Sequence, residues 1–320
     1  AVGYASLSTQ NFTTATDGFN VAMGYESGAA ITTGLSNTLV GGQSGDALTD
    51  ADFNVAVGKE ALTTDTLGSK SVAVGMGTLA NQNFTTATDS FNTAVGHIAG
   101  NAITTGVQNT LVGALAGDAL QDADNNIAIG YQALSSDTLG SRNVAIGNNA
   151  LLNQNFTTGT QSYNVAVGFS AGIAVTTGTQ NTLVGGLAGD ALTAGGSNVA
   201  LGTNSLASDT LGSRSVAIGQ GALFTQNFTT ATNNHNVAVG YEAGVLITTG
   251  VNNVLIGGLA GDSLTTAGNN VAIGYQAHST DDLGSRNVAV GTEALSDMNF
   301  ATATDSYNVA VGDQAGKRIT

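Results

Sequence analysis

A five-residue pattern of polar and hydrophobic positions recurs along the whole chain. It reads Asn, then Val, Thr or Ile, then Ala or Leu, then Val, Ile, Leu or Met, then Gly, and Ser replaces the Asn in two of its seventeen copies. The intervals between copies run 17, 17, 17 and 21 residues, and this order repeats as a 72-residue super-repeat. A short period held without a break is typical of a solenoid, whose stacked units contact only their neighbours. We therefore expect an elongated stack of coils rather than a globule. The pentads begin at residues 20, 37, 54, 71, 92, 109, 126, 143, 164, 181, 198, 215, 236, 253, 270, 287 and 308.

Each pentad predicts one short β-strand followed by a corner. Residues at positions two and four are mostly β-branched and favour a strand, with their side chains on one face and those of Asn and Ala on the other. The pentads contain no charged residue, so we expect both faces to be covered, as in parallel sheets. Gly at position five permits a backbone angle or close approach that a side chain would block. Position eight is always Ala, Ser or Thr, which predicts a second strand with small inward residues.

The Asn, Ala and Gly columns are assigned a structural role. A column of Asn suits an internal ladder of hydrogen-bonded amides, as in other parallel stacks. Small residues in the other two columns suit close packing and a tight corner. Representative residues of these columns are Asn54, Ala56, Gly58, Asn126, Ala128, Gly130, Asn198, Ala200, Gly202, Asn270, Ala272 and Gly274.

Four types of unit alternate within each super-repeat. The first ends in Ile-Thr-Thr-Gly or Val-Thr-Thr-Gly, and the third in Asp-x-Leu-Gly-Ser followed by Lys or Arg. The fourth is four residues longer and holds Asn-Phe-Thr-Thr or a close variant. The second carries Leu at position three, where we expect it to fit between Ala residues of the neighbouring coils. These leucines are Leu39, Leu111, Leu183 and Leu255.

Composition agrees with one continuous repeat structure. Of 320 residues, 42% are hydrophobic and 9% are charged, with 45 Gly and no Pro, Cys or Trp. The absence of Pro excludes collagen, and the aliphatic content excludes a disordered chain. We expect a single β-solenoid over residues 1–320, without a cofactor. Because the sequence opens with the tail of a pentad, Ala1 to Gly3, we expect the solenoid to continue beyond both ends. The sequence shows no secretory signal or transmembrane run, so we expect no membrane insertion of this segment.

Charged residues are few and recur at fixed places. The net charge of −15 disfavours nucleic acid as a partner, because phosphate contacts need Lys and Arg. Four of the seven basic residues close the third unit, each five residues after an Asp. This spacing predicts a loop-closing ion pair, with a ligand contact as the alternative. The pairs are Lys70 with Asp65, Arg142 with Asp137, Arg214 with Asp209, and Arg286 with Asp281.

A second group of acids admits a calcium site. Asp46, Asp118, Asp190 and Asp262 follow Gly at equivalent positions, and the pairs Asp50/Asp52 and Asp122/Asp124 lie nearby. Carboxylates of this kind could bind calcium. Ala and Gly replace the pairs in later repeats, at 194–196 and 267–268, so turn-forming Asp is the alternative that we favour.

The sequence does not indicate an enzyme. Glycoside hydrolysis needs two carboxylates in different environments, whereas each recurring Asp is expected to have equivalent surroundings in every repeat. His97 and His235 stand isolated in the sequence. His278 occupies a position held by Leu in the other super-repeats, and we interpret it as a tolerated variation near a coil edge.

The 21-residue unit is the candidate for recognition, because its extra length should project from the stack. It carries two aromatic or His residues at equivalent positions, surrounded by Asn, Gln and Thr. They could contact carbohydrate, or they could clamp the loop onto an adjacent chain. In the four complete copies these residues are Phe84 and Phe91, Phe156 and Tyr163, Phe228 and His235, and Phe300 and Tyr307.

The repeats resemble a known family. Asn-Val-Ala-Val-Gly at 54–58 and Ser-Val-Ala-Ile-Gly at 215–219 are similar to the head repeats of YadA-like trimeric autotransporter adhesins. Asp-Thr-Leu-Gly-Ser-Arg at 137–142 and Asn-Phe-Thr-Thr at 155–158 also resemble repeats of bacteriophage tail fibres. The resemblance implies a left-handed parallel β-roll of three chains, with the pentad strands lining the interior. The present units are longer than the usual head repeat and no stalk, neck or anchor is seen, so fibre and adhesin both remain open.

Function and partners follow from these expectations. We expect a homotrimeric, extracellular fibre segment that attaches to glycans or proteins of a host surface through many weak contacts. If each coil hides roughly 100 Å² of further apolar area on association, this contributes about 2.5 kcal/mol per coil. Paired Thr residues such as Thr32 and Thr33 suggest ice binding as a different class. Since the pairs recur only every fourth coil, a continuous ice-matching plane is not predicted.

Overall fold

The structure, a computed structural model, describes residues 1–319. They form an all-β, parallel solenoid of about 17 turns, and no helix occurs among them. The chain divides into two compact units, of which the first is Ala1–Tyr163 and the second begins at Asn164. The boundary coincides with the start of a super-repeat. Below, the first unit and the second unit mean these two parts of the chain, and the third unit and the long unit mean the third and fourth types of repeat.

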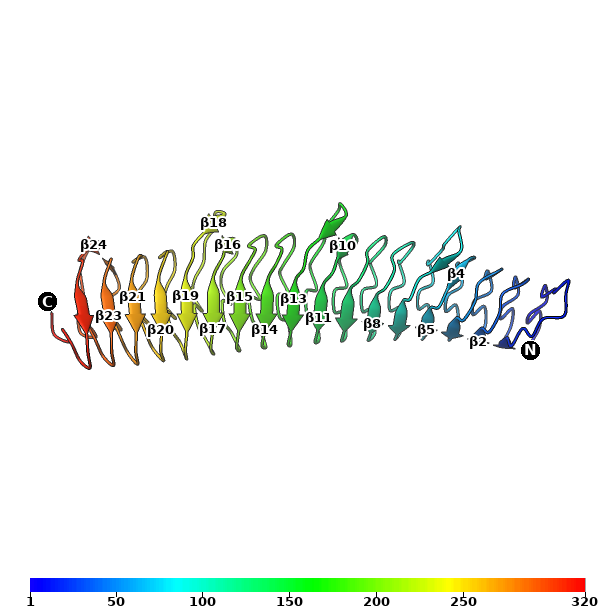
Figure 1. The fold of residues 1–320 in the computed structure, drawn as a ribbon, viewed down its shortest axis with the longest axis horizontal. Helices are drawn as coiled ribbons and strands as arrows, with labels where there is room; N and C mark the ends of the chain where they lie inside the picture. Colours follow the sequence, from blue (N-terminus) through cyan, green and yellow to red (C-terminus); the bar gives the residue numbers. More distant parts are fainter. Residues whose placement is uncertain (320) are drawn as a thin grey trace. The chain divides into compact units, whose positions relative to one another are not determined.

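Each pentad contributes one three-residue strand, and within each unit consecutive strands pair in parallel (Figure 1). In the first unit these strands are β1 (Val21–Met23), β2 (Thr38–Val40), β3 (Val55–Val57), β5 (Val72–Val74), β7 (Thr93–Val95), β8 (Thr110–Val112), β9 (Ile127–Ile129) and β11 (Val144–Ile146). In the second unit they are β13 (Val165–Val167), β14 (Thr182–Val184), β15 (Val199–Leu201), β17 (Val216–Ile218), β19 (Val237–Val239), β20 (Val254–Ile256), β21 (Val271–Ile273), β23 (Val288–Val290) and β25 (Val309–Val311).

Two-residue strands join each third unit to the long unit that follows it. They form parallel pairs, and the loops that carry them rise above their neighbours near β4, β10 and β18 (Figure 1). The long units therefore project, as their length predicts. The pairs are β4 (Gly68–Ser69) with β6 (Thr88–Asp89), β10 (Gly140–Ser141) with β12 (Thr160–Gln161), β16 (Gly212–Ser213) with β18 (Thr232–Asn233), and β22 (Gly284–Ser285) with β24 (Thr304–Asp305).

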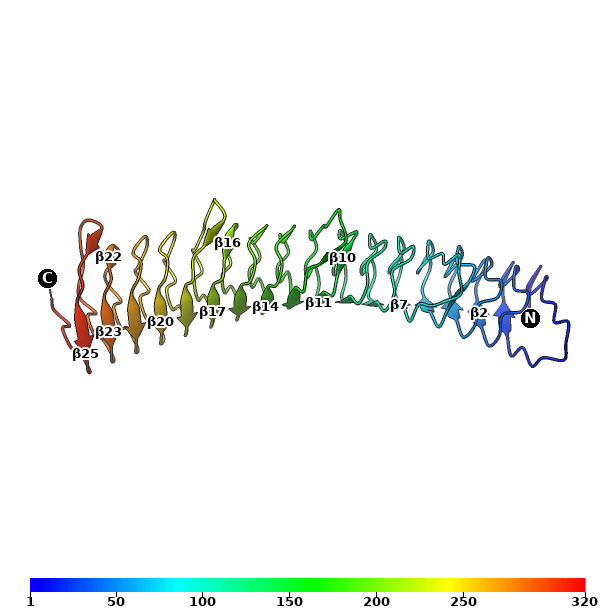
Figure 2. The ribbon, with the colours of Figure 1, turned by 45° about the horizontal axis from the view of Figure 1, so that its top comes forward.

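The core of each coil is filled by the central strand residue. Ala56 is fully buried, and its register partners are Leu39 in the preceding strand and Ala73 in the following one. The residues on either side of the central one stay partly exposed. The three-residue strands follow one another along one side of each unit (Figure 2). The predicted alternation of the two faces is confirmed.

Each Leu at the centre of a strand fills space that two nearby Gly residues leave free. Leu39 lies between Ala22 and Ala56, as predicted. Its methyl groups occupy the places where side chains of Gly28 and Gly45 would be: a Cβ on Gly28 would lie 2.7 Å from Leu39 Cδ1, and one on Gly45 2.8 Å from Cδ2. In the third and long units, where the central residue is Ala, the position that matches Gly28 and Gly45 is a buried Leu in all complete coils but one, as at Leu62 and Leu79.

The prediction of a second strand after the corner Gly is wrong. Residues after the pentad Gly form turns, because positions seven and nine both adopt left-handed backbone angles. At Glu60 and Leu62 φ is 58° and 54°. The N–H of Glu60 bonds to Gly42 O of the preceding coil at 3.0 Å, and the N–H of Leu62 to Thr78 O of the following coil at 3.0 Å. The segment thus connects to both neighbours without a strand.

Candidate functional site

The Asn column forms a buried hydrogen-bonded ladder. Asn54 N donates to Asn37 Oδ1 at 2.9 Å, and Asn54 Oδ1 accepts from Ser71 N at 2.8 Å. Its Nδ2 donates to Gly68 O at 2.9 Å. The same bond to a backbone carbonyl recurs from Asn126, Asn198 and Asn270. Because these side chains are fully buried, they hold coils together and cannot contact a ligand.

The Ala and Gly columns are equally inaccessible. Ala56, Ala128, Ala200 and Ala272 are fully buried. The corner glycines have positive φ, and a Cβ on any of them would lie within 2.6 Å of the carbonyl oxygen of the next corner Gly. These residues are Gly58, Gly130, Gly202 and Gly274.

A buried carboxylate lies beside each of the first three long units. Asp65 Oδ1 accepts from Gly68 N and from Phe84 N, both at 3.0 Å, and Oδ2 accepts from Gln82 Nε2 at 2.6 Å. Asp137 and Asp209 have the same three partners in their own repeats. The predicted ion pair with the basic residue five positions later is therefore wrong. The buried Asp instead accepts hydrogen bonds from a backbone N–H of its own coil and from a backbone N–H and a Gln side chain of the following coil.

The Gln that caps this carboxylate also bonds to the next unit. Gln82 Oε1 accepts from Asn92 Nδ2 at 2.9 Å, and Gln226 accepts in the same way from Asn236 at 2.8 Å. The network thus links three successive coils. Sequence reasoning missed it, although the signal was present: a Gln stands one coil length after the Asp in three super-repeats.

In each long unit the two aromatic or His residues differ in exposure: the first is buried or half-buried and the second lies at the surface. Phe84, Phe156 and Phe228 are buried, each 6% exposed, and Phe300 is half-buried. Their backbone N–H groups bond to the buried Asp of the preceding coil. The second members, Phe91, Tyr163, His235 and Tyr307, are exposed. Only this second set is available to a ligand.

The exposed aromatic rings lie under the basic residues of the preceding coil. Lys70 Nζ lies 5.2 Å from the centre of the Phe91 ring and 2.5 Å from Asp89 Oδ2. Arg142 and Arg286 lie over Tyr163 and Tyr307 at 5.7 and 5.8 Å, and Arg286 Nε is 3.0 Å from Asp305 Oδ2. Each exposed contact contributes roughly 0 to 1 kcal/mol. The cation fastens the long loop to its own chain and occupies one face of the ring.

The acids considered for calcium make ordinary hydrogen bonds in the first unit. Asp46 Oδ1 accepts from Thr63 at 2.6 Å, and Asp118 Oδ1 from Ser135 at 2.5 Å. Asp50 accepts from Thr33, while Asp52 and Asp124 accept from backbone N–H groups. Over residues 1–319 no three His, Cys, Asp or Glu side chains lie close enough together to hold a metal ion.

In the second unit the equivalent acids do not make this hydrogen bond: Ala207 stands at the position of the hydroxyl residue for Asp190, and Asp262 Oδ1 has no bond to Ser279. Oδ1 of Asp190 and Oδ1 of Asp262 are buried without a hydrogen bond. Burial raises the pKa of both carboxyls, and that of Asp262 to about 6. A raised pKa in the folded state stabilises the protein fully below the unfolded value, near 4, and this stabilisation is lost as the pH rises through 6.

We therefore expect Asp262→Asn to raise the free energy of unfolding at pH 7.5 by about 1 kcal/mol, a figure discounted because the group is half-solvated. At pH 4 the substitution should change little. Chemical denaturation at both pH values measures this. Asp118→Asn is the matched control, with a smaller gain, because Ser135 already donates to that carboxylate. An equal effect of Asp262→Asn at both pH values would contradict the assignment.

Further observations concern the described residues taken together and the sequence. No pocket is found among the described residues. The part of the chain that the structure covers contains no helix of the length and hydrophobicity needed to span a membrane. No protein-family model matches the chain, and a search of curated proteins finds no significant similarity.

Proposed function

We propose that this chain is a structural and adhesive fibre segment that associates with copies of itself as a homotrimer. The observation that carries the proposal is the outer face of the pentad strands. On every three-residue strand the two outward residues are Val, Ile, Leu, Met or Thr, without a charge. Examples are Ile127 and Ile129 of β9, which are 38% and 37% exposed.

The size of this face supports self-association. The first unit has 8 pentad strands with two outward residues each, and roughly 50 Å² exposed on each gives on the order of 800 Å² of apolar surface. That exceeds the largest apolar patch of most monomers, about 300 to 600 Å², and equals what one partner buries in a stable interface, about 800 Å². Because copies of one chain carry the same uncharged face, a second copy fits it without burying a charge.

The fibre role is supported by how the polar residues are used. The recurring Asn, Asp and Gln side chains bond between coils, so the side chains that recur are committed to the stack. We infer no catalytic role. Attachment to host-surface glycans or proteins would then come from many weak contacts along an extracellular fibre. We propose a left-handed, continuous solenoid whose coil lengths follow the spacing of the pentads, as the resemblance to phage tail fibres implies. A bacterial adhesin head is the alternative.

The trimer is tested by mass. We expect multi-angle light scattering of the folded chain to give three times 31.6 kDa. Ile129→Asp should reduce this mass or weaken association more than tenfold, because it places a charge in the proposed interface. Ser136→Asp, on the loop side of the same unit, serves as the control and should leave the mass unchanged. A monomer mass for the folded wild-type chain would overturn the proposal.

The long loops offer a second test, of recognition. Removing residues 155–158 from the chain deletes Phe156, whose N–H bonds to Asp137. If the loop is a clamp, the deletion lowers the melting temperature, whereas loss of cell or glycan binding at unchanged stability would assign recognition to the loop. Tyr163→Ala, which removes only the exposed ring, separates the two cases without disturbing the buried carboxylate.

A further inference from the structure

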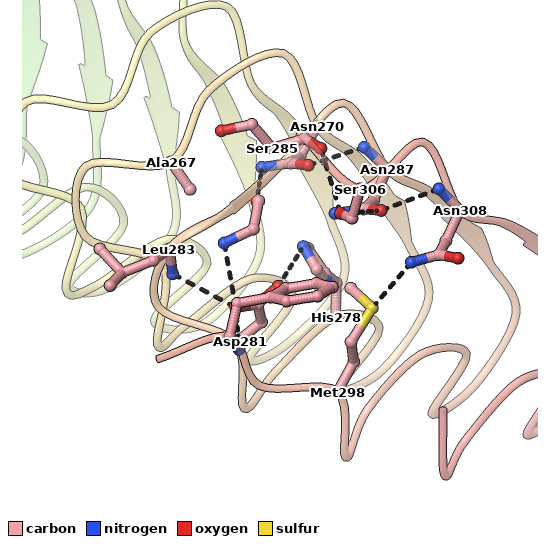
Figure 3. A network of polar contacts seen from close by, with 12 residues as sticks. Ala267, Asn270, His278, Asp281, Leu283, Ser285, Asn287, Met298, Ser306 and Asn308 are labelled. Carbon is pink, nitrogen blue, oxygen red and sulfur yellow. Dashed lines mark hydrogen bonds and ion pairs between the residues drawn. The ribbon is translucent and has the colours of Figure 1, made fainter. Parts of the chain in front are cut away.

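The last super-repeat departs from the other three at two positions that meet in space. Position nine of its third unit is His278, where the sister repeats have Leu62, Leu134 and Leu206. Position twelve of its long unit is Met298, where the sister repeats have Gln82, Gln154 and Gln226. Both positions flank the buried carboxylate, here Asp281 (Figure 3).

Met298 removes the donor on which the carboxylate depends elsewhere. A thioether cannot donate a hydrogen bond and accepts only weakly. Asp281 Oδ1 keeps its backbone partners, Gly284 N at 3.0 Å and Phe300 N at 3.2 Å. Oδ2, which accepts from Gln in the sister repeats, is buried without a hydrogen bond. An ionised oxygen in that state is costly unless another polar group compensates it.

His278 lies where that compensation is needed. Its ring is fully buried, and Nε2 is 3.8 Å from Asp281 Oδ2. The interpretation of His278 as a variation near a coil edge is therefore wrong. Figure 3 shows the ring directed at the carboxylate, with Met298 on the neighbouring coil. A small movement of either side chain brings the two atoms within hydrogen-bond distance, about 2.7 to 3.2 Å.

We propose that His278 replaces the missing Gln as the partner of the buried Asp281 carboxylate, and that this exchange makes the second unit sensitive to mild acid. The two substitutions are then one compensated change. The amide donor of the following coil is lost, and an imidazole donor from the same coil takes its place. In the sister repeats the position of His278 holds Leu, which cannot titrate.

The surroundings of the ring set the direction of the pH effect. Among the described residues, Asp281 is the charged group that acts on it. The buried residues of the two adjacent coils, 253–269 and 287–307, include Leu264, Leu295 and Met298, and no charged residue is among them. Burial lowers the pKa of His278, and the nearby Asp281 carboxylate opposes that effect.

The direction in which stability changes with pH follows from the linkage between proton binding and folding. A His whose pKa is lower in the folded than in the unfolded chain contributes stability above about pH 6.5, and this stability is lost as the pH falls toward the folded value. The second unit should therefore lose stability as the pH falls below about 6.5, in the range in which His residues commonly act as pH switches. Over the same pH range protonation of the Asp262 carboxyl has the opposite effect on stability. Variants at the two positions therefore separate the two contributions.

A double-substitution cycle on the full chain tests the proposal. His278→Leu should lower the melting temperature of the second unit at pH 7.5, because Oδ2 then has no donor. Met298→Gln should raise it, because it restores the sister arrangement. The double variant, His278→Leu with Met298→Gln, should be at least as stable as wild type. Its melting temperature should no longer show the His-dependent decrease as the pH falls below about 6.5. Leu134→Met, in the first unit, controls for a volume change at the equivalent position.

The histidine signals in NMR provide a second readout. The chain has 3 His residues, so the signals of His278 are assigned by comparing the spectra of wild type and His278→Leu. Because burial lowers it, the pKa of His278 should lie below the ordinary value of the residue, about 6.5. The proposal is overturned if His278→Leu matches wild type at every pH with Met298 in place, or if His278 titrates at or above the ordinary His value of about 6.5.

Discussion

Gly130→Val is expected to prevent the first unit from folding. Gly130 adopts a φ of 135°, which L side chains rarely adopt, and a Cβ there would lie 2.4 Å from the carbonyl oxygen of Gly147. That oxygen belongs to the backbone of the next coil, so it cannot move aside without separating the strands. We expect a loss of more than about 4 kcal/mol, the range reserved for strained backbone and buried clashes. Circular dichroism and thermal melting measure the loss.

Gly159→Ala is the matched control for this substitution. Gly159 lies in the long loop of the same unit, has no positive φ, and a Cβ there would meet nothing within 4 Å. The sister loops carry Ala at this position, as at Ala87. We expect a stability within about 0.5 kcal/mol of wild type. Equal damage from both substitutions would mean that the corner glycines are not special.

Ala128→Phe should be nearly as damaging, through packing rather than backbone strain. Ala128 is fully buried between Leu111 and Ala145, its register partners. Leu134, also fully buried, already fills the matching position of the same coil, so a Phe ring has no space and must push neighbouring coils apart. Overpacking typically costs about 1 to 3 kcal/mol and more where the backbone cannot adjust. We expect about 3 kcal/mol or more, read from chemical denaturation.

Ile127→Phe places the same ring on the opposite face of the same strand. Ile127 is 38% exposed, so the ring can lie outside the coil and the strand signal in circular dichroism should persist. If Ile127→Phe unfolded the chain and Ala128→Phe did not, the assignment of inner and outer faces would be reversed.

Strand positions could be predicted because one local pattern decides them. All seventeen pentads form three-residue strands, since β-branched residues, a small central residue and a corner Gly all favour the same conformation. The segment after the corner could not be predicted. Left-handed angles at residues such as Glu60 and Leu62 are not favoured by those residue types. They are imposed by hydrogen bonds to the coils on both sides.

The site residues show the same division. Lys70 was assigned to Asp65 from their spacing along the chain, but its partners are Asp89 and Phe91, one coil further on. In a solenoid, residues about one turn apart lie closer in space than most residues within a coil, so pairs must be sought at the length of the coil. The role of His278 was hidden for the same reason, because its significance depends on Met298 in the next coil.

The reciprocal packing of Leu39 with Gly28 and Gly45 limits how the gene for such a chain can change length. Loss of one coil, such as 37–53, would leave the space beside Gly28 empty and create a cavity, which costs about 24 cal/mol per Å³. Loss or gain of a whole super-repeat would instead return every Leu to its Gly and every buried Asp to its partner from the next coil. Recombination between misaligned repeats should therefore yield folded products whose lengths differ by whole super-repeats.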